Sequence, residues 1–314
     1  MHAYGSPGEL LLKEVSRPTP GDHEVLVRVR ATSVNDFDWG VITGKPYFYR
    51  MLFGLSKPRL SIPGIELAGT VESVGKSVTS FVPGDHVFGD TSKHGWGSFA
   101  EFMAVHQDSL SIMSEKMSFE EAAALPHASM LAMQALIDKG NLKKGERVLI
   151  NGAGGGVGTL GLQLAKLYDA EVTGVDSGNK LAMMKSIGFD NVMDYKQEDF
   201  TRAKQRYDLI VDAKSTRGPD AYRRVLKEGG RYVTVGGNLS SLLRIFLASR
   251  TYARNVHVVA LQQNKDMKFI CELFDAGKLK PVIDGPFRLE DAGQAVQYFA
   301  EGKHQGKVVI SLNH

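Results

Sequence analysis

Val148-Leu-Ile-Asn-Gly-Ala-Gly-Gly-Gly-Val-Gly158 decides the fold of this 314-residue chain. Apolar, strand-forming residues run into a glycine cluster, and an apolar helical pattern follows from Leu160 to Leu167. A strand, a tight glycine turn and a helix suit a dinucleotide pyrophosphate, because glycines admit the phosphates and the helix start supplies free N–H groups. The next apolar run, Val172 to Val175, ends in Asp176, where the ribose of an adenosine would lie. This stretch therefore predicts a nucleotide-binding unit.

The pattern around this unit predicts two domains of different type. After residue 146, strands are expected at 147–151, 171–175, 191–194, 207–212, 231–236 and 256–261, separated by helix-length segments, as in a doubly wound parallel sheet. Before residue 120, short strands and turns prevail, such as the alternating run from Val25 to Ala31. Ser118 and Glu121 form a capping-box pattern that opens a helix.

The end of the chain is predicted to return to the first domain. After residue 264 we expect a helix at 267–276, a loop through Pro281 and Pro286, a helix at 290–301 and a last strand at 307–312. The fold class is α/β: a β-rich domain at 1–121, completed by 264–314, and a Rossmann domain at 122–263.

Composition excludes several function classes. The net charge of +3 is too small to indicate nucleic-acid binding, and the one cysteine, Cys271, allows neither an internal disulfide nor a cysteine-rich metal site. The most apolar stretch, Leu239 to Ala248, is short and contains Arg244. No signal-peptide pattern opens the chain. We therefore expect a cytoplasmic protein that binds neither nucleic acid nor membrane. For the segment from Leu239 to Ala248 we expect one of three roles: it covers a substrate pocket, it joins two subunits or it packs in the core.

Several local motifs follow one another along nearly the whole chain: Ala31-Thr-Ser-Val-Asn-Asp-Phe-Asp38, Pro63-Gly-Ile-Glu-Leu-Ala-Gly69, Val82-Pro-Gly-Asp-His-Val87, Gly97-Ser-Phe-Ala-Glu101, Ala122-Ala-Ala-Leu-Pro126, Gln134-Ala-Leu136, the glycine loop and Gly306-Lys-Val-Val309. In this order they resemble the medium-chain dehydrogenases/reductases, in their zinc-independent, quinone-oxidoreductase-like branch. The resemblance implies a GroES-like first domain and a family that often forms a homodimer, here through an edge strand at Val256 to Leu261. Relatives usually carry one more strand before the segment resembling Tyr4 to Pro7, so we expect a weaker edge here.

The resemblance also implies an enzyme without a catalytic metal. Zinc-dependent relatives place a cysteine where this chain has Asn35, a histidine where it has Ile65, and a further ligand near Pro126. Zinc needs about three protein ligands and an open position, which an amide and an alkyl group do not supply. No helical spacing pairs His94, His106 and His127, and we assign these histidines surface or packing roles.

The cofactor implied by the resemblance is a nicotinamide dinucleotide. Its pyrophosphate would lie against Gly155, Gly156 and Val157, with further contacts from Tyr195, Lys307 and the loop at Gly236 and Gly237. Ser177 and Lys180 match relatives that hold the 2′-phosphate of NADPH, whereas a carboxylate at Asp176 favours the ribose hydroxyl of NADH or simply caps a helix. We expect NADPH, with NADH as the alternative. Leu131 stands where relatives commonly carry a threonine facing the nicotinamide.

Chemistry without a metal favours quinones and α,β-unsaturated carbonyls (enals and enones), because conjugation spreads the charge that a hydride brings. The segment from Asn35 to Tyr49 is expected to line the substrate site. Asn35 is either a donor there or a polar turn residue, and Asp38 is more a structural acceptor than a proton carrier. The usual tyrosine positions fall on Gly40 and Pro46, which leaves Tyr47, and behind it Tyr49, as candidate proton donors.

Two other functions remain open at this point. An enoyl-thioester reductase would need a basic patch for the carrier phosphate, for which Arg223, Arg224 and Lys227 are candidates and a solvated helix face is the simpler explanation. A protein that binds NADPH, reports the redox state to a partner and turns over little would explain the missing tyrosines and Leu131. Turnover separates this sensor from both enzymes.

Overall fold

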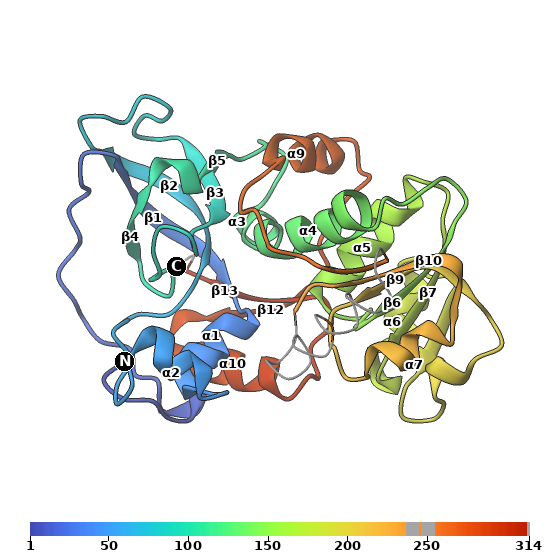
Figure 1. The fold of residues 1–314 in the computed structure, drawn as a ribbon. Coiled ribbons are helices and arrows are strands. Elements are labelled where there is room, and N and C mark those ends of the chain that lie inside the picture. The colour runs from blue at the N-terminus through green and yellow to red at the C-terminus, as the bar shows by residue number, and fades with distance from the viewer. Residues whose placement is uncertain (237–244, 246–254, 313–314) are drawn as a thin grey trace. The chain divides into compact units, whose positions relative to one another are not determined.

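The chain folds into two compact units in a computed structural model that describes residues 1–236, 245 and 255–312. Unit 1 comprises Met1–His127 and Gln263–His314, and unit 2 comprises Ala128–Gln262. The division falls within α4 (Pro126–Met133), a few residues beyond the boundary expected from the sequence. Figure 1 shows the chain order of the elements.

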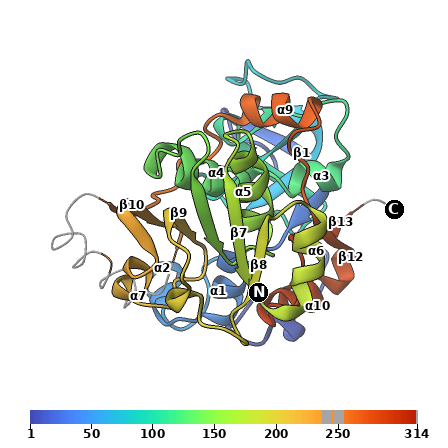
Figure 2. The same cartoon turned by 90° about the vertical axis from the view of Figure 1, so that its right-hand side faces the viewer.

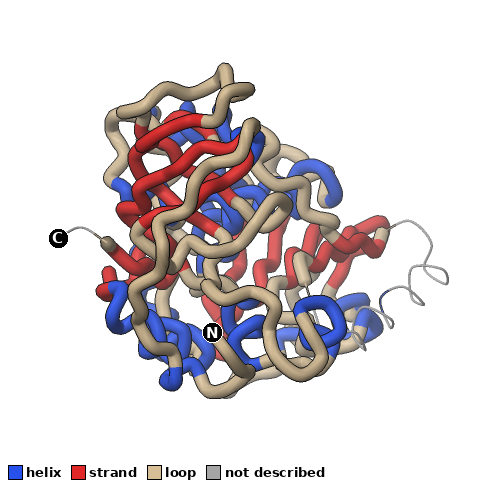
Figure 3. The backbone as a smooth tube through the Cα atoms, turned by 90° about the vertical axis from the view of Figure 1, so that its left-hand side faces the viewer, coloured by secondary structure: helices blue, strands red, loops and turns tan. Residues whose placement is uncertain are grey.

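Unit 1 is built on a mostly antiparallel sheet. Its strands run in the order β12-β13-β1-β2-β3-β5, and β4 pairs with β1. Figure 3 draws the strands in red along the backbone. Their bounds are β1 Glu24–Ser33, β2 Glu66–Val74, β3 His86–Asp90, β4 Phe102–His106, β5 Ser111–Ile112, β12 Ile283–Arg288 and β13 Lys307–Ser311. The helical segments are η1 Pro7–Glu9, α1 Asp36–Thr43, α2 Phe48–Phe53, η2 Gln107–Ser109, α3 Phe119–Ala123, α9 Met267–Asp275, η6 Leu289–Asp291 and α10 Ala292–Ala300.

The last strand returns to this sheet, as the sequence predicted. β13 pairs antiparallel with the end of β1, with Thr32 opposite Ile310. Alternate residues of β1, among them Val27 and Val29, pack with Val308 and Ile310 in one apolar core. Burial of these aliphatic side chains supplies the main driving force for closing the chain. The expected capping box is also present, since Ser118 and Glu121 each accept the other's backbone N–H.

Two expectations for unit 1 were wrong. The loop expected through Pro286 contains β12, which pairs parallel with β13 at the edge of the sheet. An edge strand tolerates proline, and a register shift between Asp284 and Phe287 accommodates it. The segment from 36 to 53, expected as strands and turns, instead forms α1 and α2. Neither helix is long enough to show the apolar periodicity that identifies a helix in sequence.

Unit 2 is a parallel sheet with strand order β11-β10-β9-β6-β7-β8, shown from its side in Figure 2. The strands are β6 Arg147–Asn151, β7 Glu171–Asp176, β8 Asn191–Asp194, β9 Tyr207–Asp212, β10 Leu226–Thr234 and β11 Val256–Val258. The helical segments beside α4 are η3 Gln134–Lys139, α5 Gly156–Lys166, η4 Gly178–Lys180, α6 Leu181–Ser186, η5 Phe200–Arg202 and α7 Pro219–Arg223. This is the doubly wound order that the sequence predicted.

Differences in unit 2 lie at strand ends. β10 begins earlier than expected and β11 ends at Val258, three residues before the expected end. β11 is the edge strand among the described residues, and pairing of two subunits through it stays a prediction. Leu239 to Ala248 falls almost entirely outside the described residues, as does Gly237. None of the helices in the described ranges has the length and apolarity needed to cross a bilayer.

The glycine loop follows β6, whose two neighbours in the sheet are β7 and β9. This is the switch point of the sheet, where a ligand meets the carboxyl ends of the strands. Gly158, in the first turn of α5, lies so close to the loop that an added Cβ would stand 2.4 Å from the Cα of Ala153. Only glycine fits this approach of helix to strand end.

Replacing Gly158 by alanine is expected to destabilise unit 2 by about 2 kcal/mol or more, because the overpacked Cβ has backbone as its neighbour. Gly161→Ala in the same helix is the matched control, since its Cβ would meet the nearest atom at 3.4 Å. This control should be neutral or stabilising by up to about 1 kcal/mol. Urea unfolding measures both variants. Equal effects would contradict the packing argument.

Candidate active site

A buried ionic cluster joins three distant parts of unit 1. Glu66, in β2, is fully buried, and its Oε2 accepts hydrogen bonds from Lys307 Nζ at 2.6 Å and from Asn35 Nδ2 at 2.8 Å. Lys307 Nζ also donates to Asn35 Oδ1 at 2.7 Å. Ser33 Oγ donates to the same carboxylate oxygen at 2.6 Å. A buried carboxylate is stable only when paired in this way, so the cluster ties the last strand to the start of the fold.

The other oxygen of Glu66 positions a histidine. The backbone N–H of His127, at the start of α4, donates to Glu66 Oε1 at 2.6 Å. The imidazole Nδ1 lies 2.7 Å from Oδ2 of Asp90, the last residue of β3, and both side chains are buried. Nε2 of His127 has no hydrogen-bond partner among the described residues. Sequence reasoning missed this pair because 37 residues separate its members.

The charges of this pair stabilise each other. Burial alone would lower the pKa of His127, but the hydrogen bond and charge of Asp90 outweigh burial and raise it. Burial acts on Asp90 in the opposite sense, and its hydrogen bond to His127 leaves the pKa of the carboxyl below its usual value. Each partner thus favours the charged form of the other, and in the charged form of His127 the Nε2 carries an N–H that the described residues leave unbonded.

Aromatic rings stand beside this histidine. Phe37, 40% exposed, makes an edge contact with the His127 ring at a centroid distance of 5.8 Å. Phe37 also contacts Trp96 and Tyr49, each at 6.2 Å. Phe53 lies 5.1 Å from Trp96 and 6.0 Å from Tyr49, so these rings form one cluster, the aromatic wall, consisting of Phe37, Tyr49, Phe53 and Trp96. Such a wall suits a flat, conjugated ligand.

The structure separates the two candidate tyrosines. Tyr47 is 71% exposed, and its ring lies under the guanidinium of Arg50. Tyr49 belongs to the aromatic wall, and its ring lies against Gly40, where an added Cβ would stand 2.5 Å from Cζ of Tyr49. Burial, followed by the charges of Asp36 and Asp38, raises the pKa of Tyr49 to about 12. Of the two, Tyr49 is the tyrosine placed with the other site residues.

Asp38 is held by the backbone. Its two oxygens accept hydrogen bonds from the N–H of Asn35 at 2.8 Å and of Gly64 at 3.0 Å. Burial raises the pKa of Asp38 to about 7, against these donors and the charge of Lys307, which lower it. Asp38 thus anchors the start of α1 to the Gly64 turn. These contacts fit a structural acceptor, the role that the sequence analysis favoured for this residue.

In unit 2 the glycine loop presents the start of α5 to a ligand. Gly155 is the N-cap residue, so the N–H groups of Gly156, Val157 and Gly158 have no acceptor inside the helix. α5 is 11 residues long, and its dipole adds positive potential at this end. Gly236 follows β10 at the same, carboxyl-terminal edge of the sheet. These residues fit a pyrophosphate.

Asp176 and Lys180, which we expected to face the ribose of the cofactor or its 2′-phosphate, contact each other and the glycine loop instead. Asp176 Oδ2 accepts the N–H of Gly154 at 2.8 Å, Oδ1 accepts the N–H of Ser177 at 2.8 Å, and Lys180 Nζ lies 3.5 Å from Oδ1. Lys180 is only 1% exposed, so its ammonium neutralises Asp176 instead of standing free for a phosphate. A sequence motif does not show that the lysine side chain folds back over Gly154.

Lys196 is an exposed cation close to the end of β7. The sequence analysis did not name it as a cofactor-binding residue. Tyr195 and Lys196 follow the end of β8, beside the end of β7, and both side chains are exposed. The ammonium of Lys196 lies 5.9 Å from the centroid of the Tyr195 ring. Tyr195 thus stands at the carboxyl edge of the sheet with a cation over it.

The comparisons with known proteins agree with both units. Residues 21–115 match the model of the alcohol dehydrogenase GroES-like domain, and residues 187–310 match that of zinc-binding dehydrogenases. A 2-methylene-furan-3-one reductase of Solanum lycopersicum is 32% identical, with 98% of this chain and 76% of that protein covered. A chloroplast envelope quinone oxidoreductase homolog of Arabidopsis thaliana is 31% identical, with 95% and 92% covered. The solved quinone oxidoreductase of Coxiella burnetii superposes with a TM-score of 0.88 at 27% identity, over 99% of this chain and 98% of that one.

Replacing Lys307 by methionine is expected to destabilise the protein by about 3–5 kcal/mol, because Glu66 is left as a buried carboxylate without its cation. Adding Glu66→Gln should recover part of this loss. Lys303→Met, which breaks an exposed pair with Glu301, is the matched control and should cost at most about 1 kcal/mol. Guanidinium unfolding gives all three values. Similar losses for the two lysine variants would refute the assigned role of Lys307.

Proposed function

The chain belongs to the quinone-oxidoreductase-like branch of the medium-chain dehydrogenase/reductase family, and we propose that it is an NADPH-dependent reductase of quinones and α,β-unsaturated carbonyls. The observation that carries the proposal is the Asp90–His127 couple beside the aromatic wall. It combines a proton source with a surface for a planar conjugated substrate. The tomato relative is a 2-methylene-furan-3-one reductase and the Arabidopsis relative a quinone oxidoreductase homolog, and these names refer to the same two substrate classes.

The cofactor, when bound, supplies a hydride to the conjugated system of the substrate. The carbonyl oxygen of that substrate then gains negative charge and needs a donor. Nε2–H of His127, beside the aromatic wall, is the proposed donor, and Asp90 holds the ring by Nδ1 and stabilises its charge. Proton transfer from Nε2 leaves a neutral imidazole, which water reprotonates. The aromatic wall orients the flat substrate against this ring.

The proposed reaction uses no metal. Ile65 offers no ligand atom, and the oxygens of Asn35 and Glu66 already bind the ammonium of Lys307 at 2.7 and 2.6 Å. A cation placed there would compete with Lys307 for the same oxygens. The hydrogen-bond donor that this chain presents, His127, takes the part that a Lewis acid has in zinc-dependent relatives.

NADPH is the proposed cofactor because of the charges near the end of β7. Lys180 neutralises Asp176, whose oxygens accept backbone N–H groups, so little negative charge opposes a 2′-phosphate there. Lys196 supplies an exposed cation beside the end of β7. Ser177, buried against Asp176, belongs to the support of the loop.

His127→Gln is expected to lower kcat/KM for an enone by about 10²-fold or more, since a general acid is lost. Quinone reduction should fall less, because hydride transfer to a quinone leaves a hydroquinone anion that water protonates without a protein acid. With the native protein, kcat/KM should decrease as pH rises through the raised pKa of His127, and Asp90→Asn should move this decrease to lower pH. His86→Gln, an exposed histidine on β3, is the matched control. An unchanged profile in Asp90→Asn would exclude His127 as the acid, and absence of turnover would favour the sensor.

Lys196→Glu is expected to raise the Kd for NADPH about tenfold or more while changing that for NADH little, because the 2′-phosphate is the group that distinguishes the two cofactors. Lys144→Glu makes the same charge change in the turn before β6, at the opposite edge of the sheet, and should leave both constants near those of the native protein. Fluorescence titration of the reduced cofactors measures them. Equal weakening of both cofactors would refute a phosphate contact.

A further inference from the structure

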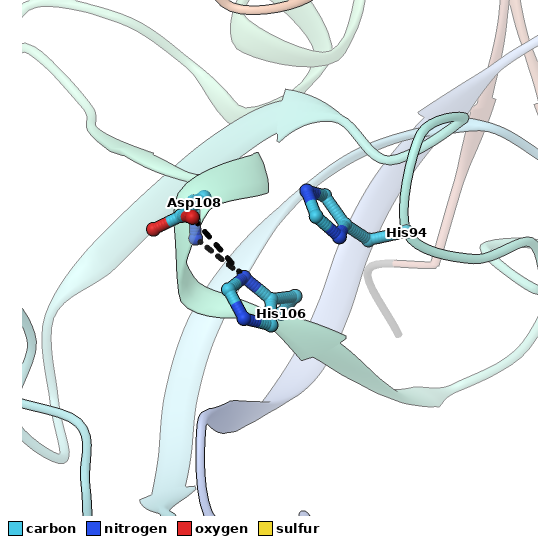
Figure 4. A group of neighbouring side chains, drawn as sticks. All are labelled: His94, His106 and Asp108. Carbon is cyan, nitrogen blue, oxygen red and sulfur yellow. Dashed lines mark hydrogen bonds and ion pairs between the residues drawn. The ribbon is translucent and has the colours of Figure 1, made fainter.

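Three potential metal ligands meet on the surface of unit 1, and none of them is a residue assigned to the proposed reaction. His94 lies in the turn after β3, His106 ends β4, and Asp108 lies in η2 (Figure 4). One ligand atom from each residue lies within 4.8 Å of the other two. The sequence gives no sign of this group, because the β3–β4 connection brings His94 back to a strand end 12 residues later.

The spacing of the group approaches that of a zinc site. Nδ1 of His106 lies 3.6 Å from a carboxylate oxygen of Asp108. Tetrahedral zinc with bonds of about 2.0–2.2 Å sets its ligand atoms roughly 3.3–3.5 Å apart. The His94 ring stacks on that of His106 with centroids 4.5 Å apart. Because His94 is exposed, rotation of its side chain closes the remaining distance without moving the backbone.

The chemistry of the group also favours a divalent transition metal. Two imidazoles and one carboxylate form a set typical of zinc, with further positions left to water, whereas magnesium prefers oxygen ligands alone. A third imidazole, His23, stacks on His106 at 6.1 Å.

We propose that His94, His106 and Asp108 form a surface site for Zn²⁺ that braces the β3–β4 connection against the end of β4. The ion would take one nitrogen from each histidine and one oxygen from Asp108, and water would complete its shell. Binding displaces the long hydrogen bond, 3.3 Å, that the N–H of Asp108 makes to Nδ1 of His106. None of its ligands belongs to the ionic cluster, the aromatic wall or the glycine loop, so the site can be tested apart from the proposed reaction.

The test is calorimetric titration of the chelator-treated full-length protein with Zn²⁺. We expect a Kd on the order of 10 µM and no comparable binding of Mg²⁺. His94→Ala and Asp108→Ala should each weaken binding at least about tenfold. His86→Ala, an exposed histidine elsewhere on the same sheet, should bind as the native protein does.

Thermal unfolding gives a second readout that does not depend on turnover. Zn²⁺ should raise the unfolding midpoint of the native protein and of His86→Ala by a few degrees, but not that of His94→Ala. Binding and stabilisation that persist in both His94→Ala and Asp108→Ala would overturn the proposal, as would a native protein that does not bind Zn²⁺. Turnover with NADPH should be equal with and without chelator, so failure of the zinc site leaves the proposed function untouched.

Discussion

A carboxylate buried at Glu66 is the constraint on which unit 1 depends. An unpaired charge in the core costs several kcal/mol, so the fold must bring a cation to Glu66, and it brings Lys307 from the far end of the chain. The strand that carries Lys307 pairs with β1 and completes the core. The pairing of Glu66 and the packing of the apolar core thus both require the last strand to return to β1. The same topology therefore satisfies the electrostatic and the hydrophobic requirement.

The same carboxylate links the framework to the candidate chemistry. One oxygen holds Lys307 and Asn35, and the other holds the backbone of His127. His127 in turn contacts Asp90 through its ring and the aromatic wall through Phe37. A rigid second layer of hydrogen bonds is what a proton donor needs to keep one orientation. The residues that stabilise unit 1 therefore also orient the proposed acid.

In unit 2, two residues that the sequence analysis assigned to cofactor binding, Asp176 and Lys180, have a structural role. Asp176 and Lys180 are used to hold the glycine loop, since Asp176 accepts the N–H of Gly154 and Lys180 covers that glycine. The groups left to a ligand are the free N–H groups of α5 and the exposed pair Tyr195 and Lys196. A charged residue at the end of the second strand therefore does not by itself identify the cofactor. Whether that residue is paired with an opposite charge, as Asp176 is with Lys180, decides which charge a bound cofactor contacts there.

The sequence by itself determined the doubly wound sheet, the glycine loop, the capping box at Ser118 and the return of the last strand. The first three depend on a local period or on residues a few positions apart, which sequence patterns record. It did not show β12, because a proline there suggested a loop and only its place at the sheet edge makes a strand tolerable. It also did not show the Asp90–His127 couple, the aromatic wall or the His94–His106–Asp108 group. Their members come from different elements, and only tertiary packing decides which polar and aromatic side chains meet.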